Sequence, residues 1–424
     1  MKLFNINQIK FQLIGDKSIA HRAIILASLN KNKNIIRNFP KNDDVLTTLN
    51  ALSKFGLIYE SNNDTLYIDS SKINFNKKNI KIECNESGTT ARLLLGLLVG
   101  KNINAILSGS NSLLSRPMKR VISPFQEFGA NIDAINNRLP LTVNKSIHTA
   151  PFEYNLKVAS AQVKSSLILY AMNMNGISIL MGKIETRDHL ERLLLHLGYP
   201  IKIFKDKIKI KGNVKIKNKI DIKIPGDISS AAFLMCACIL KVNSSIIIND
   251  VCLNNYRTGF IDAVIKMGGK ICITNKKNMF GDEVGDIKVS YSSNLHGIQI
   301  DKKEIVTMID EVPILSVLAL FADGNTVIKG IDELKIKESN RVDAIIANIK
   351  LMGGQACEKN GSLIIKGGNR LYNTNIKSYN DHRIFMSFFI ANSIISAKFQ
   401  YDKNDKSYTK SFPDFIDKIN EILS

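Results

Sequence analysis

One arrangement of apolar and polar residues recurs six times along the chain. A short polar cluster precedes an apolar stretch of helical character, a small turn and an apolar strand that ends near glycine. The clusters begin at residues 15, 87, 160, 226, 309 and 381, so successive copies are 66 to 83 residues apart. This regularity indicates duplication of one unit. Solenoid repeats span only about 20 to 50 residues, so a longer unit predicts a small motif with its own sheet.

Each copy also contains a second, amphipathic helix, and in the first five copies this helix ends at glycine, as in HLERLLLHLG. Glycine at that position is typical of a left-handed helix C-cap, so we expect the GG pairs at Gly268 and Gly353 to be caps, not phosphate loops. The sixth copy, FPDFIDKINEIL, ends the chain without a following strand. The N-terminal segment MKLFNINQIKFQL alternates like a strand, and we expect it to fill that vacancy.

The chain is predicted to form two lobes of three repeats each. Its 424 residues exceed the roughly 250 to 300 that a single core accommodates. If the N-terminal strand joins the last repeat, one lobe is discontinuous and contains both termini. We therefore expect one lobe from residues 1–13 plus 226–424 and a continuous lobe from residues 14–225.

Composition narrows the functional classes. No apolar run approaches the roughly 20 residues of a membrane helix, and six scattered cysteines without a CxxC pair indicate reduced thiols and no zinc site. We therefore expect a cytoplasmic protein without a metal. The formal charge of +20 suits a nucleic-acid partner, but much of the lysine alternates with isoleucine, as on a solvated strand face. We expect neither a nucleic-acid nor a membrane partner.

The polar clusters predict an anion site, because helix N-termini offer unpaired N–H donors and a positive dipole end. Ser18 and Arg22 are four residues apart and share a helix face, and we expect the same of Lys337 and Arg341. Other cations lie in or near the clusters: Lys17, Arg92, Arg116, Arg120, Lys164, Arg187, Arg383 and Lys410. If the clusters converge, the site is strongly cationic and suits a small, multiply anionic ligand.

Carboxylates interrupt this positive field at Asp310, Glu311 and Glu338, each at a predicted helix start. A carboxylate among cations is usually an ion-pair partner, but its place in an anion site also suits proton transfer. We expect His21 and His382 to be structural, and His189 to be a cap or a surface residue.

Ten segments stand in order between Gly15 and Pro413: GDKSIAHRA, SGTTARLLLGLL, LSRPMKRVISPFQEFGA, LPLTV, ASAQVKSSLILYA, TRDHLERLL, IPGDISSAAFL, IDEVPILSVLA, LKIKESNRVDAI and YNDHRIFMSF. Together they resemble the motif set of the 5-enolpyruvylshikimate-3-phosphate synthase family. The resemblance implies an α/β fold, a two-lobed inverse α/β barrel in which each lobe has three βαβαββ repeats and the lobes close on the substrates. It also implies transfer of the enolpyruvyl group of phosphoenolpyruvate to the 5-hydroxyl of shikimate 3-phosphate, without a cofactor or metal, in the shikimate pathway of aromatic amino-acid biosynthesis.

The same resemblance implies substrate-binding residues. Shikimate 3-phosphate is expected on Lys17, Ser18, Arg22, Ser160, Ala161, Gln162, Asp310 and Lys337. Phosphoenolpyruvate is expected on Gly88, Arg116, Arg341, Arg383 and Lys410, with Lys17 and Gln162 reaching both substrates. Lys164 and Arg187 match a variant of the motif found in part of the family, with Arg187 as a substrate ligand. A monomer is expected.

In the implied mechanism, Asp310 accepts the proton of the 5-hydroxyl, and Glu338, with Lys17 nearby, protonates the methylene carbon of phosphoenolpyruvate. The tetrahedral intermediate then loses phosphate.

The chain departs from the family pattern at Asp16, Asn85, Glu86 and Asn340. Glu86 opposes phosphoenolpyruvate electrostatically unless it pairs with a neighbouring arginine. Two other functions stay open. One is the enolpyruvyl transferase of the same fold that acts on UDP-N-acetylglucosamine, although that enzyme usually has a cysteine in the loop that reads SLLSRPMKR here. The other is a basic RNA-binding or RNA-end-processing protein, although the clusters contain almost no aromatic residues.

Overall fold

The computed structural model describes residues 8–77, 79–146, 149–396 and 398–424. These residues divide into two compact units. Unit 1 comprises the described residues up to Ile14, Pro225–Met279 and Glu283–Ser424, and unit 2 comprises Gly15–Ile224 and Phe280–Asp282. Residues 1–7, which the sequence assigns to the discontinuous lobe, lie outside the described residues. Nothing in the sequence pattern predicts the short second segment of unit 2.

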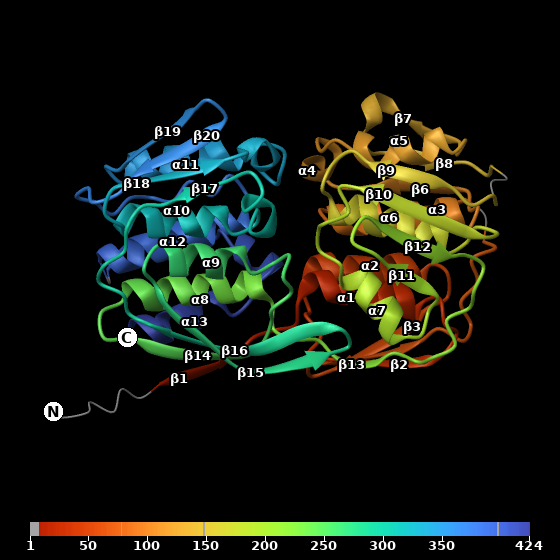
Figure 1. Cartoon of the computed structure of the whole chain (residues 1–424), viewed down its shortest axis with the longest axis horizontal. Coiled ribbons are helices and arrows are strands. Elements are labelled where there is room, and N and C mark those ends of the chain that lie inside the picture. Colours follow the sequence, from red (N-terminus) through yellow and green to blue (C-terminus); the bar gives the residue numbers. More distant parts are fainter. Residues whose placement is uncertain (1–7, 78, 147–148, 397) are drawn as a thin grey trace. The chain divides into compact units, whose positions relative to one another are not determined.

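Unit 2 is built from three successive repeats (Figure 1). The first contains α1 (Lys17–Ala27), β2 (Lys33–Arg37), α2 (Asp43–Ser53), β3 (Ile58–Asn62) and β4 (Thr65–Asp69). The second contains β5 (Ile80–Glu83), α3 (Gly88–Gly100), β6 (Ala105–Ser108), α4 (Asn111–Leu114), α5 (Lys119–Glu127), β7 (Ile132–Ala134) and β8 (Leu141–Val143). The third contains β9 (Glu153–Leu156), α6 (Ala161–Ala171), β10 (Ile177–Gly182), α7 (His189–His196), β11 (Ile201–Ile203) and β12 (Lys207–Lys211), and β13 (Asp221–Lys223) ends the unit.

Unit 1 repeats the same plan. It contains β1 (Ile9–Gln12), α8 (Ile228–Leu240), β14 (Ser245–Cys252), α9 (Gly259–Lys266), β15 (Lys270–Met279) and β16 (Asp282–Ser290, apart from Asp282). It continues with β17 (Gln299–Ile300), α10 (Val312–Phe321), β18 (Asn325–Lys329), α11 (Arg341–Leu351), β19 (Gln355–Lys359) and β20 (Ser362–Lys366). The last helices are α12 (His382–Ile395) and α13 (Phe415–Leu423).

Every described sheet has four strands and one order of connection. In the sheet β5-β6-β8-β7, the strands before and after α3 run parallel, and the next two strands add antiparallel. The sheets β17-β18-β20-β19 and β11-β12-β10-β9 follow the same rule around α10 and α6. The mixed α/β fold with repeated βαβ units in two domains is therefore confirmed.

The first strand of the chain does not take the place that the sequence predicts. β1 pairs in parallel with β14, with Ile9 opposite Ile246, so it belongs to the fourth repeat. β13 pairs in the same way with β2 and completes the first repeat. The expectation that the N-terminal segment fills the sixth repeat is wrong, and no described residue between α12 and α13 lies in a strand. An alternating pattern sets which face of a strand is buried, but it does not select the sheet that the strand joins.

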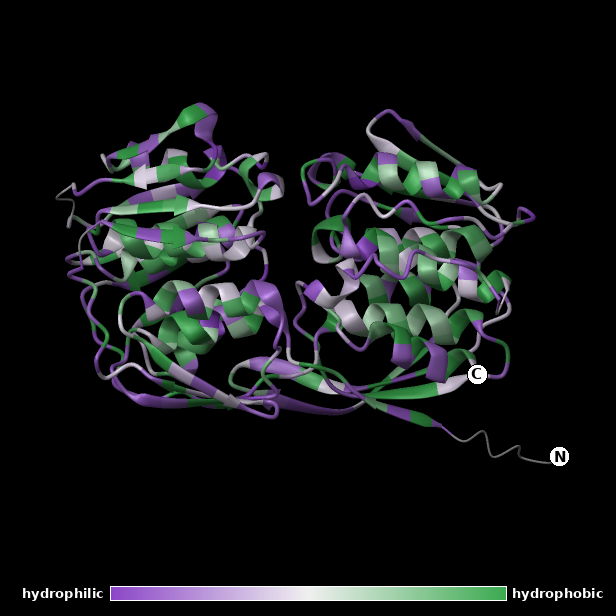
Figure 2. Ribbon diagram, turned by 180° about the vertical axis from the view of Figure 1, so that it is seen from behind, coloured by the Kyte–Doolittle hydropathy of each residue, from purple (hydrophilic) through white to green (hydrophobic). Residues whose placement is uncertain are grey.

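The core of each unit is made by the apolar helices that follow the polar clusters. Every residue of α8 except Leu240 is buried, and so is every residue of α10 except Phe321. Figure 2 shows these helices as hydrophobic segments. The predicted C-caps are confirmed, since Gly268 and Gly353 have φ of 92° and 82°. Within the described ranges, we find no helix with the length and apolar character needed to cross a membrane.

Candidate active site

The polar clusters lie at helix starts, as predicted. Asp16 caps α1 through a 3.0 Å hydrogen bond that Oδ1 accepts from the Ile19 amide, and Ser87 and Ser160 cap α3 and α6 in the same way. Asp16 is fully buried. The unusual acid at the front of the first cluster is therefore a helix cap, and its carboxylate takes up a donor that the helix itself leaves unsatisfied.

In unit 2, the cations of α1 are held by neighbouring elements. Lys17 Nζ lies 2.8 Å from Asp44 Oδ2, at the start of α2. Arg22, which is 3% exposed, donates to the Ser18 carbonyl at 2.9 Å and to Ser165 Oγ of α6 at 3.0 and 3.2 Å. The predicted shared face of Ser18 and Arg22 is confirmed. These contacts with protein atoms hold both cations in place.

A second cationic group surrounds the start of α3. Arg92 Nη1 donates to Gln162 Oε1 at 2.8 Å, and Gln162 Nε2 donates to Thr89 Oγ1 at 3.0 Å. A Cβ placed on Gly88 would lie 2.7 Å from Arg92 Nη1 and 3.5 Å from Arg116 Nη1. Two guanidinium groups therefore converge over a glycine at a helix N-terminus, an arrangement that suits a carboxylate or phosphate.

Lys164 does not contribute a cation to this group, contrary to the sequence prediction. Its side chain is 1% exposed, and Nζ lies 2.7 Å from Glu191 Oε1. Nζ also donates to the carbonyls of Ile184 and Thr186 at 2.9 and 2.8 Å. Two N–H donors of the ammonium are thus bound to backbone carbonyls, and the Glu191 carboxylate offsets its charge. Lys164 is therefore a buried structural cation, and it binds the carbonyl group that directly precedes Arg187 in the chain.

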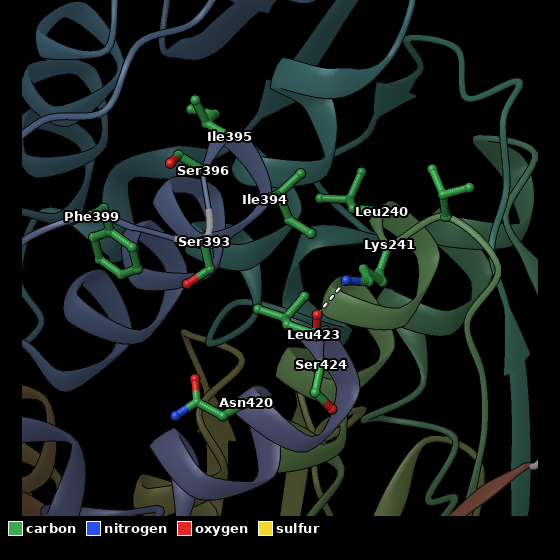
Figure 3. A pocket seen from close by; sticks show the side chains of 11 residues that line it. Leu240, Lys241, Ser393, Ile394, Ile395, Ser396, Phe399, Asn420, Leu423 and Ser424 are labelled. Atoms are coloured by element: carbon green, nitrogen blue, oxygen red, sulfur yellow. Dashed lines mark hydrogen bonds between the residues drawn. The ribbon is translucent and has the colours of Figure 1, made fainter.

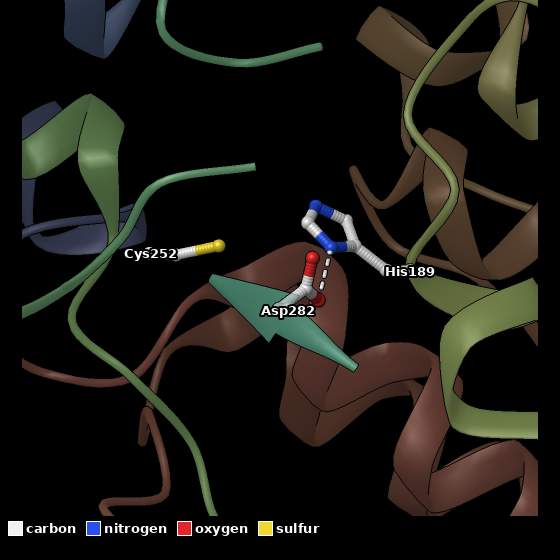
Figure 4. Close-up of side chains that lie close together, drawn as sticks. All are labelled: His189, Cys252 and Asp282. Atoms are coloured by element: carbon white, nitrogen blue, oxygen red, sulfur yellow. Dashed lines mark hydrogen bonds and ion pairs between the residues drawn. The ribbon is translucent and has the colours of Figure 1, made fainter. Parts of the chain in front are cut away.

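His21 and His189 of unit 2 have structural environments. His21 is buried beside Thr48 Oγ1, 2.7 Å from Nδ1, and burial lowers its pKa to about 3, so it is neutral. His189 is also buried, and its Nδ1 lies 2.9 Å from Asp282 Oδ2 (Figure 4). The prediction of a cap or surface role for His189 is wrong, because its side chain is fully buried. Its partner Asp282 is distant in the sequence, so no local pattern indicated the pair. Cys252, drawn in the same view, belongs to unit 1.

In unit 1, carboxylates and cations form one network. Asp310 Oδ1 lies 3.4 Å from both Lys337 Nζ and Arg341 Nη1. Arg341 also contacts Glu338 at 2.7 Å and Asp381 at 2.8 Å. Lys337 precedes α11 and does not lie on it, so the predicted shared helix face with Arg341 is wrong. The two side chains meet at Asp310 instead.

The rest of this network surrounds Arg383 at the start of α12. Its Nη1 donates to the Asp310 carbonyl at 2.9 Å and lies 3.5 Å from Glu311 Oε1. Ser229 at the start of α8 donates to the same Glu311 oxygen. Lys410 lies in a short 3₁₀ turn, Ser407–Lys410, that packs on α12. Backbone and carboxylate groups thus hold Arg383 in one orientation.

The electrostatics of Arg341 and Asp381 are set by their contact. Burial acts to raise the pKa of Asp381, but the charge and hydrogen bond of Arg341 together with the neighbouring His382 outweigh it, so the pKa of Asp381 lies below its ordinary value. Burial acts to lower the pKa of Arg341, and Asp381, Glu338 and Asp310 together raise it above its ordinary value. Both groups are therefore charged at neutral pH.

Sequence reasoning missed several partners that hold the predicted residues. Asp381 stands directly before His382 and Arg383, and it both pairs with Arg341 and accepts a hydrogen bond from the Arg383 amide at 2.9 Å. Its place as an acidic N-cap was the available signal. Asp44 and Ser165 have no comparable signal, because their contacts join separate helices.

The structure brings the predicted residues of each unit into local groups. In unit 2, α6 links the groups at α1 and α3 through Ser165 and Gln162. A pocket of about 540 Å³ in unit 1 lies elsewhere (Figure 3), lined mainly by α8, α12 and α13 residues such as Leu240, Ile394 and Leu423. None of the predicted site residues lines this pocket.

Comparisons with known proteins support the family resemblance that the ordered motifs indicate. A model of the family described as EPSP synthase (3-phosphoshikimate 1-carboxyvinyltransferase) matches residues 8–419. The 3-phosphoshikimate 1-carboxyvinyltransferase of Clostridium tetani is 38% identical over 97% of this chain and 94% of its own length. That of Oceanobacillus iheyensis is 37% identical over 96% and 95%. The structure of EPSP synthase from Acinetobacter baumannii, 29% identical, superposes with a TM-score of 0.84 over 98% of this chain and 96% of that one.

Proposed function

The chain belongs to the EPSP synthase family, and from this membership we propose how its residues carry out the family's reaction. That reaction transfers the enolpyruvyl group of phosphoenolpyruvate to the 5-hydroxyl of shikimate 3-phosphate and releases phosphate, in the shikimate pathway of aromatic amino-acid biosynthesis. The family match over residues 8–419 carries the assignment. The comparisons favour neither a UDP-N-acetylglucosamine enolpyruvyl transferase nor an RNA-binding protein.

Unit 2 binds shikimate 3-phosphate through the starts of α1 and α6. Lys17, Ser18 and Arg22 supply two cations and a hydroxyl, and Ser160, Ala161 and Gln162 supply the N-terminal turn of α6. The held orientations of Lys17 and Arg22 support this role, because a preorganised cation loses little entropy on binding. Arg187, which follows the backbone held by Lys164, adds a further cation for this substrate.

The residues that we propose as phosphoenolpyruvate ligands are those that match the family's motifs. Gly88 and Arg116 of unit 2 contact phosphoenolpyruvate, and the convergence of guanidinium groups over Gly88 supports this role. The remaining ligands are Arg341, Arg383 and Lys410 of unit 1. Lys17 and Gln162 reach both substrates. Arginine is suited to this task, because its planar guanidinium binds carboxylate or phosphate with two hydrogen bonds.

Unit 1 supplies the proton-transfer groups. Asp310, which with Lys337 also contacts shikimate 3-phosphate, accepts the proton of the 5-hydroxyl as its oxygen attacks phosphoenolpyruvate. Glu338 delivers a proton to the methylene carbon, with Lys17 also taking part. Arg341 Nη2 lies 2.7 Å from Glu338 Oε2, so the proposed proton donor adjoins a proposed phosphoenolpyruvate ligand.

Collapse of the tetrahedral intermediate re-forms the double bond: the C–O bond to phosphate breaks, and the methyl group returns one proton to Glu338, which is a carboxylate after the first step. As the C–O bond to phosphate breaks, charge grows on the departing phosphate, and Arg116, Arg383 and Lys410 stabilise it. These roles require neither a cofactor nor a metal. The partners are the two small-molecule substrates, and we place the protein in the cytoplasm as a monomer.

The test is phosphate release from purified protein. We expect release with shikimate 3-phosphate plus phosphoenolpyruvate, and none when UDP-N-acetylglucosamine replaces the shikimate. Asp310→Asn and Glu338→Gln should lower kcat by about 100-fold or more, the usual contribution of a general acid or base. Each variant should still bind shikimate 3-phosphate in calorimetry. Salt-sensitive RNA retention without phosphate release would overturn the proposal.

A further inference from the structure

Lys164 is hydrogen-bonded to the backbone beside Arg187, a residue that we propose binds the substrate. It lies one turn inside α6, two residues after Gln162 and four after Ser160. Its ammonium bridges α6 to the segment that joins β10 to α7, where it meets the Ile184 and Thr186 carbonyls, and to Glu191 in α7. We propose that Lys164 and Glu191 are positioning residues that set the backbone of Arg187 against the start of α6. The inference rests on the proposed function, in which both elements bind shikimate 3-phosphate.

The contact with Thr186 acts directly on Arg187. The Thr186 carbonyl and the Arg187 amide nitrogen belong to one planar peptide group, so a bond that holds the carbonyl also fixes that plane. The second bond, to the Ile184 carbonyl, holds the segment two residues earlier. The direction in which the Arg187 side chain leaves the backbone is thereby coupled to α6.

The charge of Lys164 is not available to a ligand. Both Lys164 and Glu191 have side chains that are 1% exposed, and they lie 2.7 Å apart. Removing one member of a buried ion pair leaves an uncompensated buried charge, which is strongly destabilising. The pair is neutral as a whole, so it contributes position and not attraction. The electrostatic attraction comes from Arg187, which is only partly buried.

The α6 side of the bridge is rigid. α6 packs closely on α3 at Gly96, where an added Cβ would lie 2.1 Å from the Ser166 carbonyl oxygen. Ser166 Oγ in turn donates to the Arg92 carbonyl at 2.7 Å. Lys164 therefore connects the Arg187 segment to α6, and α6 is itself packed against α3, where we propose that Gly88 binds phosphoenolpyruvate.

The test uses a variant that removes both charges. Lys164→Met alone leaves Glu191 buried and unpaired, so the double variant Lys164→Met/Glu191→Gln is compared with the wild type by circular dichroism and thermal unfolding. Binding of shikimate 3-phosphate is measured by calorimetry without phosphoenolpyruvate. We expect the double variant to weaken this binding by about 10-fold, and Arg187→Met by about 10- to 100-fold, the range of one charge-assisted contact.

The decisive measurement is the coupling between the two changes. If the pair acts through Arg187, adding Lys164→Met/Glu191→Gln to Arg187→Met weakens binding by less than twofold further. The KM for shikimate 3-phosphate should rise in the double variant while the KM for phosphoenolpyruvate changes by less than about twofold. The proposal would be overturned if the combined variant lost affinity by the product of the losses measured for Arg187→Met and for the double variant. It would also be overturned if the double variant folded and kept the affinity of the wild type.

Lys241 offers a matched control. Its Nζ also donates to a backbone carbonyl, that of Leu423, but beside the unit 1 pocket in which no predicted site residue takes part (Figure 3). Lys241→Met should lower the unfolding temperature and leave the affinity for shikimate 3-phosphate within twofold. An equal loss of affinity in this control would overturn the proposal. A wild-type protein that binds no shikimate 3-phosphate would overturn the proposed function itself, and this inference with it.

Discussion

The pH dependence of stability should depend on His21. This side chain lies on the buried face of α1, between Ser18 and Arg22, with Nδ1 2.7 Å from Thr48 Oγ1. Burial lowers its pKa from 6.5 to about 3. Replacement by asparagine, whose amide can also hydrogen-bond Thr48, should make the protein less sensitive to acid than the wild type.

The size of the effect follows from proton linkage. The folded state keeps His21 neutral down to about pH 3, whereas the unfolded chain takes up a proton below about pH 6.5. The contribution to stability is therefore complete above pH 6.5 and is lost as the pH falls toward 3. Between pH 7.5 and pH 5.0 this linkage lowers the free energy of unfolding by about 2 kcal/mol.

Urea unfolding followed by far-ultraviolet circular dichroism measures this difference. The wild type should lose about 2 kcal/mol more than His21→Asn between the two pH values. His196→Asn is the matched control, because His196 is an exposed histidine of the same unit, and it should behave as the wild type. In proton NMR, the resonance absent from His21→Asn should not titrate between pH 8 and pH 5. Equal pH dependence in wild type and His21→Asn would refute the reasoning.

Two further substitutions test the anion groups. Gly88→Ala places a methyl group 2.7 Å from Arg92 Nη1, so the guanidinium must move. We expect the KM for phosphoenolpyruvate to rise by about 10-fold or more. The affinity for shikimate 3-phosphate, measured by calorimetry, should be unchanged. Asp381→Asn keeps an oxygen to cap α12 but removes the charge that pairs with Arg341, and it should lower the free energy of unfolding by about 3 kcal/mol at pH 7. Because the pKa of Asp381 is depressed, this difference should shrink as the pH falls through that pKa, and a difference that persists unchanged at low pH would contradict the assignment.

Local chemistry made much of the fold predictable. The helices that follow Asp16, Ser87 and Ser160 begin where the capping residues stand, because a cap satisfies donors within three residues of itself. Gly268 and Gly353 mark helix ends for an equally local reason, since glycine adopts positive φ without steric cost. Strand pairing depends on distant segments, and there the sequence misled: β1 and β13 alternate like any strand, yet each completes the sheet of a repeat in the other half of the sequence.

The site residues show the same contrast between local signals, which the sequence reveals, and contacts between distant segments, which it does not. Motif order placed Arg341, Arg383 and Asp310 near helix starts, and each lies there. Lys164 carries the same sequence signal as a ligand-binding cation, but its ion pair with Glu191 forms only when α7 packs on the unit. For Lys337, the helical spacing to Arg341 was misleading, because Asn340 caps α11 and so ends the helix before it reaches Lys337.

The charges within unit 1 argue for a division of labour between the two halves of the sequence. The described network around Arg341 contains the cations Lys337, Arg341 and Arg383 and the carboxylates Asp310, Glu311, Glu338 and Asp381. Carboxylates outnumber cations in this network. Such a network suits the proposed proton transfer, since its carboxylates stay close to the cations that offset them. We therefore expect most of the attraction for the anionic substrates to come from unit 2, where Arg22, Arg92 and Arg116 gather at helix N-termini and Lys17 pairs with Asp44.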